Sequence, residues 1–142
     1  MSRYFALALS CVVAFMFPRC DRMWPDVYWR SERYVAMAID SPEQMFIAFD
    51  GADRSASQLV AATVFAIGAD DRYIVVKQHP AENSLSPGDR SRTNYFYIER
   101  THSPNFRERQ RGVTGPLSEQ EFRERAAALR LPPFQKVFRE LE

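Results

Sequence analysis

Two histidines are the first side chains in this sequence that could carry out chemistry. His79 and His102 each follow a segment that reads as a β-strand, so their rings could lie close together. With a carboxylate such as Glu82 or Glu99 as a third ligand, they would form a metal site. No ligand spacing in the sequence supports such a site. We therefore predict no metal and interpret both residues as solvated loop histidines.

A group of arginines follows the second of these strands. Arg107, Arg109 and Arg111 stand behind several aromatic residues, a combination that also occurs in platforms for single-stranded nucleic acid. Glu99 and Glu108 dilute the positive charge and the chain as a whole is not basic, so we expect no nucleic-acid partner. If this loop and the two histidines form a binding site, the expected ligand is an anionic lipid headgroup or an acidic protein patch.

The patterns of nucleophilic and calcium-dependent enzymes are missing from the sequence. It contains no G-x-S-x-G motif, and its serines lie among turn-forming residues. The segment from Asp50 to Asp53 has the beginning of a calcium loop but lacks the remaining ligands. Both cysteines, Cys11 and Cys20, fall in an N-terminal apolar segment. We therefore predict a non-enzymatic protein without a cofactor.

The N-terminal apolar segment has the length and charge of an export signal. Residues 5–17 form an uncharged run that follows Arg3 and ends at Pro18. This run is too short for a bilayer-spanning helix, which needs about 20 residues, but it suits the core of a signal peptide. Large apolar residues would point to all sides of a helix here, which argues against the alternative of a helix in the protein core.

Cys20 lies where the lipid-modified cysteine of a bacterial lipoprotein would lie. The residues before it, Phe17, Pro18 and Arg19, depart from the small residues that such signals carry. Lipid attachment at Cys20 and a leader without lipid therefore both stay open. In either case we predict that residues 1–20 are a leader and that the protein is exported to the cell envelope, either periplasmic or membrane-anchored.

Length and composition predict one folded domain after the leader, at residues 21–142. The chain has 142 residues, of which 46% are hydrophobic, and a formal net charge of +1. This is enough apolar sequence for a core and argues against disorder. Removing the leader takes away Arg3 and Arg19, which leaves 17 basic against 18 acidic residues. The domain itself is thus close to neutral.

Apolar residues alternate with a period of two through much of the domain. After a lead-in at 21–32, this pattern predicts strands at 33–40, 44–50, 58–68, 72–78 and 94–99. Residues 58–63 alone could instead be helical. The Ser- and Pro-rich stretch 79–93 is expected to be a mobile or functional loop, and 100–116 a second open stretch.

The C-terminal part contains the clearest helix signals. Ser118 and Glu121 have the spacing of a capping box and predict a helix over 119–130. Residues 134–142 are either a short helix or an edge strand. Strands followed by a helix predict an α+β fold, an antiparallel β-sheet meander with the C-terminal helix packed on one face.

Three of these segments also carry a resemblance. "RYIVVKQHP", "NYFYIER" and "TGPLSEQEFRERAAALRLP" follow one another as they do in a family of small uncharacterised bacterial envelope proteins, often lipoproteins. The resemblance covers residues 60–133 and implies an envelope location but no catalytic residue. We expect a binding or structural module whose partner is an unknown protein or envelope component. The alternatives are an inhibitor or immunity-type protein that neutralises a toxin, and a small hydrolase with an unrecognised site.

Overall fold

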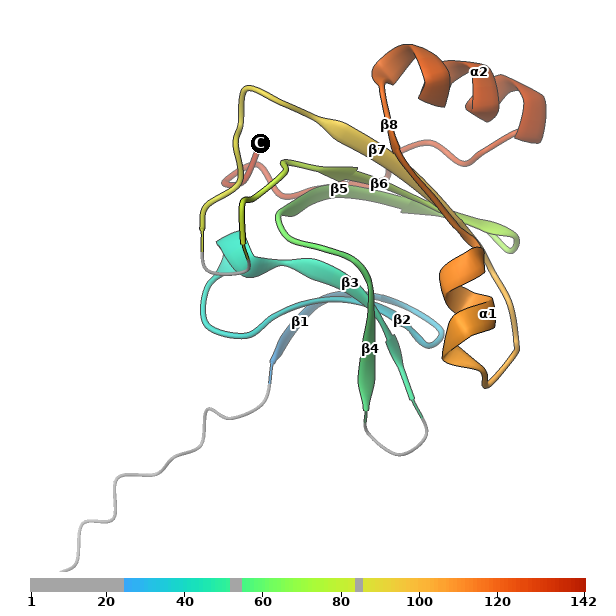
Figure 1. The fold of residues 1–142 in the computed structure, drawn as a ribbon, viewed down its shortest axis with the longest axis horizontal. Coiled ribbons are helices and arrows are strands. Elements are labelled where there is room, and N and C mark those ends of the chain that lie inside the picture. The colour runs from blue at the N-terminus through green and yellow to red at the C-terminus, as the bar shows by residue number, and fades with distance from the viewer. Residues whose placement is uncertain (1–24, 52–54, 84–85) are drawn as a thin grey trace, which may run out of the picture.

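Two antiparallel β-sheets form the body of the protein (Figure 1). The computed structural model describes residues 25–51, 55–83 and 86–142. The predicted leader at 1–20, including Cys20, lies outside the described residues. Within the described ranges, no helix is long and apolar enough to cross a membrane.

The first sheet contains four antiparallel strands in the order β1-β2-β3-β4. Its elements are β1 Asp26–Ser31, β2 Tyr34–Ala38, the short 3-10 helix η1 Pro42–Gln44, β3 Phe46–Asp50 and β4 Ala56–Val60. The predicted strand pair is confirmed as β2 and β3, in which Tyr34 pairs with Phe49. The prediction of a lead-in at 21–32 is wrong from residue 26 onward, because β1 adds an edge strand that pairs with β2.

The second sheet contains five antiparallel strands in the order β8-β7-β6-β5-β9. Its strands are β5 Val64–Ala69, β6 Tyr73–Gln78, β7 Asn94–Glu99, β8 Val113–Leu117 and β9 Lys136–Val137. The predicted hairpin is confirmed as β5 and β6. In its turn the Asp70 carboxylate accepts hydrogen bonds from the backbone N–H groups of Arg72 and Tyr73, at 2.8 and 2.7 Å. An aspartate in this position stabilises a tight turn.

The long apolar run at 58–68 is two strands rather than one. The chain leaves the first sheet at the end of β4 and joins the second sheet at the start of β5. Thr63 holds this crossing, because its hydroxyl donates to the Glu43 carbonyl and its backbone exchanges two hydrogen bonds with His79. The helical alternative for 58–63 is wrong, since residues 58–60 belong to β4, which pairs with β3, and residues 61–63 form no helix.

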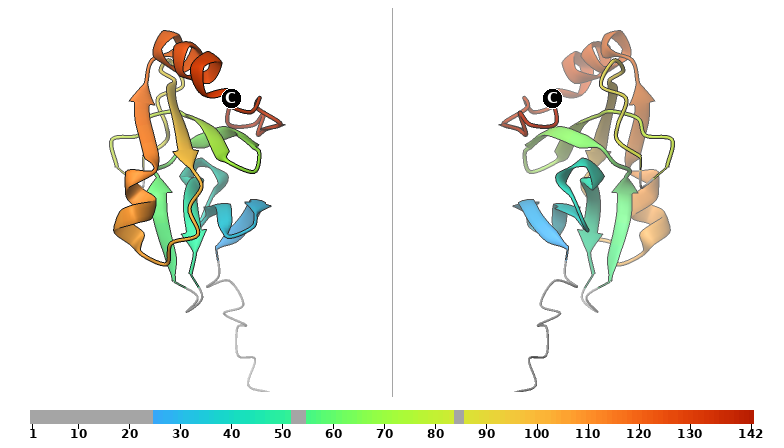
Figure 2. Two further views of the ribbon diagram at one scale, coloured as in Figure 1. Left: turned by 90° about the vertical axis from the view of Figure 1, so that its right-hand side faces the viewer. Right: turned by 90° about the vertical axis from the view of Figure 1, so that its left-hand side faces the viewer.

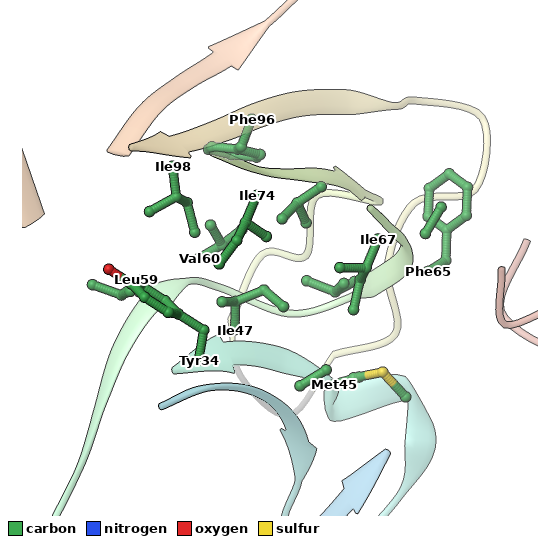
Figure 3. Packing of buried hydrophobic residues seen from close by; sticks show 14 of the residues in the cluster. Tyr34, Met45, Ile47, Leu59, Val60, Phe65, Ile67, Ile74, Phe96 and Ile98 are labelled. Carbon is green, nitrogen blue, oxygen red and sulfur yellow. The ribbon is translucent and has the colours of Figure 1, made fainter. Parts of the chain in front are cut away.

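The main hydrophobic core lies between the two sheets (Figure 3). It takes Tyr34 and Ile47 from the first sheet and Ile74 and Ile98 from the second. All four are almost completely buried. Full burial of one such side chain stabilises a fold by about 1.5–3 kcal/mol. The core therefore holds the two sheets together as one packed unit.

Helix α2, Glu119–Leu129, covers part of the opposite face of the second sheet (Figure 2). Its Phe122 packs on Tyr95, which projects from β7 away from the main core. The predicted capping box is confirmed. The Ser118 hydroxyl accepts from the Glu121 N–H, and the Glu121 carboxylate accepts from the Ser118 N–H at 2.8 Å. The hydrogen bond from the Ser118 hydroxyl, followed by that from its backbone, lowers the pKa of Glu121.

The stretch 100–116, predicted as open, contains two elements. Helix α1, Phe106–Arg111, begins after Asn105, whose side chain accepts from the Arg107 N–H at 2.9 Å. It contacts β4 of the first sheet and β8 of the second, and so joins the two sheets at one end (Figure 1). At the C-terminus, β9 confirms the strand alternative for part of 134–142. The α+β class with mainly antiparallel strands is confirmed, but two sheets stand where the sequence suggests one.

Candidate functional site

His79 is packed inside the protein and is not a solvated loop residue. It is 3% exposed, and its ring stacks on Phe65 with the centroids 4.1 Å apart. Its Nδ1 lies 2.7 Å from the Arg92 carbonyl oxygen. A Cβ on Gly88 would lie 2.7 Å from the Cβ of His79, so the loop can close over this histidine only with glycine there. The prediction of a solvated His79 is wrong because the loop folds back over the ring.

His102 is exposed, as predicted, but it lies at the opposite end of the second sheet. Strands β6 and β7 run antiparallel, so the residues that follow them leave the sheet at opposite ends. About five residues of strand, or 17 Å, separate these ends. The two histidines therefore cannot share a metal. Nowhere in the described ranges do three or more His, Cys, Asp or Glu side chains form a group that could hold one.

The described parts of the loop 79–93 are held by hydrogen bonds. The Asp89 carboxylate accepts from the hydroxyl and then the backbone N–H of Ser91, and these bonds lower the pKa of Asp89. Arg90 donates to the Glu140 carbonyl at 2.9 Å and so ties the loop to the C-terminal segment. These contacts make the loop a structural cover over His79.

The predicted arginine loop contributes to a cluster that we call the arginine end, formed by Arg33, Arg100 and Arg109 with the rings of Tyr34 and Phe49. The Arg109 guanidinium lies 4.0 Å from the centroid of the Phe49 ring, and that of Arg33 lies 5.0 Å from it. Arg100 lies 5.6 Å from the centroid of Tyr34. Cations within about 6 Å of a ring face are attracted by its π-electrons. The cluster therefore holds three cations at one end of the first sheet.

Two small hollows flank Thr101 at the arginine end. The smaller, of about 130 Å³, is lined by Glu32, Arg33, Tyr34, Phe49, Thr101 and His102. The larger, of about 350 Å³, is lined by Glu99, Arg100, Thr101, Glu108, Arg111 and Gly112. Of the predicted binding residues, His102 and Arg111 line these hollows, Arg109 is buried against Phe49, and Arg107 lines neither.

A larger pocket lies at the other end of the first sheet, and of the sequence predictions only the functional loop 79–93 contributes to it. Its volume is about 410 Å³, within the range of typical small-ligand sites. Its lining comes from the β2–β3 connection and the start of β3, from β4 and the residues directly after it, and from the loop after β6. These residues are Ile39, Asp40, Gln44, Phe46, Gln58, Ala61, Ala62, Ala81, Glu82 and Asn83. We call it the acidic pocket.

Apolar and acidic groups meet in the acidic pocket. Ile39 is 64% exposed there, and Phe46 belongs to a small apolar cluster on the outer face of the first sheet. Neither Asp40 nor Glu82 forms an ion pair with a residue that the structure describes. The lining includes no lysine, arginine or histidine. Gln44 accepts a hydrogen bond from the Asp40 N–H at 3.3 Å through Oε1, which leaves its NH₂ group as a donor to a ligand.

A family model described as a protein of unknown function, DUF3997, matches residues 31–138. The chain belongs to the DUF3997 family. No curated protein and no solved structure matches it. The matched residues contain the whole of the acidic pocket and of the arginine end, so both lie within the DUF3997 region.

The acidic pocket of this DUF3997 protein draws on three segments that are far apart in the sequence and carry no motif. One local signal exists. Ile39 continues the alternation of β2 past the end of the strand, where the chain turns and no core remains for it to join. A single exposed apolar residue is common on protein surfaces, so this signal alone could not have located the pocket.

Proposed function

We propose that this protein is an exported, membrane-tethered binding module that holds a cationic group with an apolar stem in the acidic pocket. The lining of the pocket supports this proposal, because it combines two carboxylates, three side-chain amides and five apolar residues. An amine or guanidinium would gain charge-assisted hydrogen bonds from Asp40 and Glu82. Its carbon stem would contact Ile39 and Phe46.

The charge around the acidic pocket favours a cation over an anion. Asp40 and Glu82 are both in the lining, and Glu43 is the neighbour of Gln44 in η1. A hydrogen bond from its own backbone N–H, followed by one from the Ser41 hydroxyl, lowers the pKa of Glu43, and the charge of Arg90 acts in the same direction. An anionic ligand would have to approach these carboxylates, whereas a cation would be attracted by them.

The position of the pocket fits a location close to a membrane. Asp26, the first residue of β1, pairs with Ala38, and the next residue, Ile39, lines the pocket. Five residues lie between Cys20 and β1, and five residues span at most about 18 Å. An anchor at Cys20 would hold the acidic pocket near the membrane surface and the arginine end farther from it. The resemblance to envelope lipoproteins supports the same location.

The inhibitor or immunity-type alternative would use the same pocket. A lysine or arginine side chain of a target protein has the charge and the carbon stem that the lining requires. In that case the bound cation would belong to a protein rather than to a small amine. The same carboxylates and apolar side chains of the acidic pocket would contact it.

The test uses the full chain in a nonionic detergent, labelled with ¹⁵N in its glutamine and asparagine side chains. Three probes separate the two parts of the proposed ligand: n-butylammonium has charge and stem, n-butanol has the stem alone, and ammonium has the charge alone. We expect n-butylammonium to shift the amide signals of Gln44 and Gln58 in a saturable way. We expect it to bind about tenfold or more tightly than either partial probe, a difference of about 1.4 kcal/mol.

Two pairs of variants show whether the pocket carboxylates are responsible. Asp40→Asn and Glu82→Gln should each weaken n-butylammonium binding, because each removes one negative charge from the lining. Asp71→Asn and Glu124→Gln are the matched controls, since both carboxylates are exposed and lie outside the pocket. Equal binding of all three probes, or equal losses in all four variants, would contradict the proposal.

A further inference from the structure

We propose that the arginine end is a second binding site, one that takes a carboxylate group of an acidic protein segment. The observation behind it is Arg109, which is only 6% exposed. Its NH1 group donates to the Ser103 carbonyl at 2.8 Å, but its buried Nε has no hydrogen-bond partner. No carboxylate of the described residues forms an ion pair with it. A buried cation without a counter-ion attracts an anion from outside.

Arg100 repeats this pattern beside Arg109. Its side chain is largely buried, and its Nε also lacks a partner. Its other nitrogens are engaged, since NH2 donates to the Ser31 hydroxyl and NH1 lies 3.5 Å from the Glu32 carboxylate. Buried polar groups in folded proteins are normally hydrogen-bonded, so two unpartnered guanidinium Nε atoms at one end of the molecule call for an explanation.

The charges around the two hollows define how much negative charge the site can accept. Their linings contain three arginines and three glutamates, which balance one another. Arg109, against the Phe49 ring that lines the smaller hollow, is the surplus cation. One surplus charge matches one carboxylate. A doubly charged phosphate would meet Glu32 in the smaller hollow or Glu99 and Glu108 in the larger one.

The groups that can contact the ligand directly are the exposed ones. Arg33 uses its Nε to donate to the Asp50 carbonyl at 2.9 Å, and its terminal nitrogens have no partner among the described residues. His102 stands beside it in the lining of the smaller hollow, and Arg111 lines the larger hollow. A guanidinium binds a carboxylate through two parallel hydrogen bonds. Arg33 in the smaller hollow and Arg111 in the larger one are therefore the groups that can bind a carboxylate directly, and the buried Arg100 and Arg109 add positive charge beside them.

The test uses the full chain in a nonionic detergent with ¹⁵N-labelled arginine, so that each Nε–H group gives its own signal. The probes are a hexaglutamate peptide, a hexaglutamine peptide of the same length, and inorganic phosphate. We expect hexaglutamate to shift the Nε–H signals of Arg100 and Arg109 in a saturable way and to bind less tightly as salt is raised. We expect hexaglutamine to have no effect and phosphate to bind more weakly than hexaglutamate.

Exposed arginines provide the matched variants. The double variant Arg33→Gln/Arg111→Gln should bind hexaglutamate about tenfold or more weakly, because it removes both direct contacts. The control is Arg125→Gln/Arg139→Gln, which removes two exposed arginines that line neither hollow. An equal loss in the control, or no shift of the Arg100 and Arg109 signals, would overturn the proposal. Tighter binding of phosphate than of hexaglutamate would overturn the choice of a carboxylate.

Discussion

Replacing Arg109 with methionine separates a structural role of this buried cation from a functional one. Methionine is unbranched and can follow the path of the arginine stem as far as the position of Nε, so it keeps an apolar stem at this buried site. The change removes the hydrogen bond to the Ser103 carbonyl and the contact with the ring at 4.0 Å. It also removes the buried Nε that has no partner.

The magnitudes of these effects nearly cancel. Loss of a hydrogen bond from a charged group costs about 1.5–3 kcal/mol, and loss of the cation–π contact about 0.5–2 kcal/mol. Two other effects stabilise the variant. Removal of the unpartnered Nε stabilises it by about 1–3 kcal/mol, and a sulfur–aromatic contact stabilises it by about 0.3–1.5 kcal/mol. Taken at the middle of these ranges, the losses exceed the gains by less than about 1 kcal/mol, so we expect Arg109→Met to lower the free energy of unfolding by about that amount.

Urea denaturation followed by the near-ultraviolet signal of the aromatic residues measures this change directly. We expect Arg109→Met to unfold within about 1 kcal/mol of the parent chain with an unchanged dependence on urea. Phe49→Leu is a useful comparison, because it keeps an apolar residue but removes the ring from beneath two guanidinium groups. A loss of about 3 kcal/mol or more in Arg109→Met would refute the reasoning, since it would show that the cation is needed for the fold itself.

Three further predictions concern stability. Ser118→Ala should lower the free energy of unfolding by about 1 kcal/mol through loss of the helix cap, and an unchanged denaturation midpoint would contradict the capping box. Hydrogen bonds from Ser118 make the pKa of Glu121 lower in the folded protein than in the unfolded chain. The ionised carboxylate therefore stabilises the folded state at a pH above the pKa that Glu121 has in the unfolded chain. This stabilisation is lost as the pH falls through the pKa that Glu121 has in the folded protein. The stability difference between the parent chain and Glu121→Gln should therefore shrink between about pH 6 and about pH 3 in urea titrations. Gly68→Ala would place a Cβ 1.9 Å from the Pro133 carbonyl oxygen, and calorimetry should show a loss of about 1–3 kcal/mol.

Some strands and the C-terminal helix could be predicted because their own residues form a clear apolar pattern or a helix cap. Strand β6 has a continuous apolar run, β7 has three consecutive aromatic residues followed by Ile98, and α2 has its capping box at Ser118. These patterns depend only on neighbouring residues, so they can be read without knowledge of the fold. The helix, two of the main strands and the turn between β5 and β6 follow from them.

The elements that were missed lack such signals. Helix α1 has six residues, five of which are polar or charged, so it shows no apolar stripe. Strand β8 contains Gly115 and Pro116, which are unfavourable in a central strand but acceptable at a sheet edge. The crossing at Thr63 is hidden because the strands on either side are both apolar, and only the pairing with β3 and β6 separates them.

The candidate sites depend on tertiary structure to a greater degree. From the sequence alone the two histidines could have approached each other, because each follows a strand, but antiparallel pairing of β6 and β7 sends them to opposite ends. The acidic pocket joins residues as distant as Ile39 and Asn83, and the sequence has no periodicity that connects them. The arginine loop was found because cations and aromatic residues cluster locally, but the contact of Arg109 with Phe49 could not be foreseen.

The most direct test of a membrane-tethered module is the intact mass of the protein recovered from each fraction of a bacterial host. We predict a membrane-bound species that begins at Cys20 and is heavier by a diacylglyceryl group and an acyl chain. A full-length, unmodified species in the soluble fraction would contradict the account. It would mean that residues 5–17 belong to the folded protein, and the orientation of the acidic pocket toward a membrane would no longer hold.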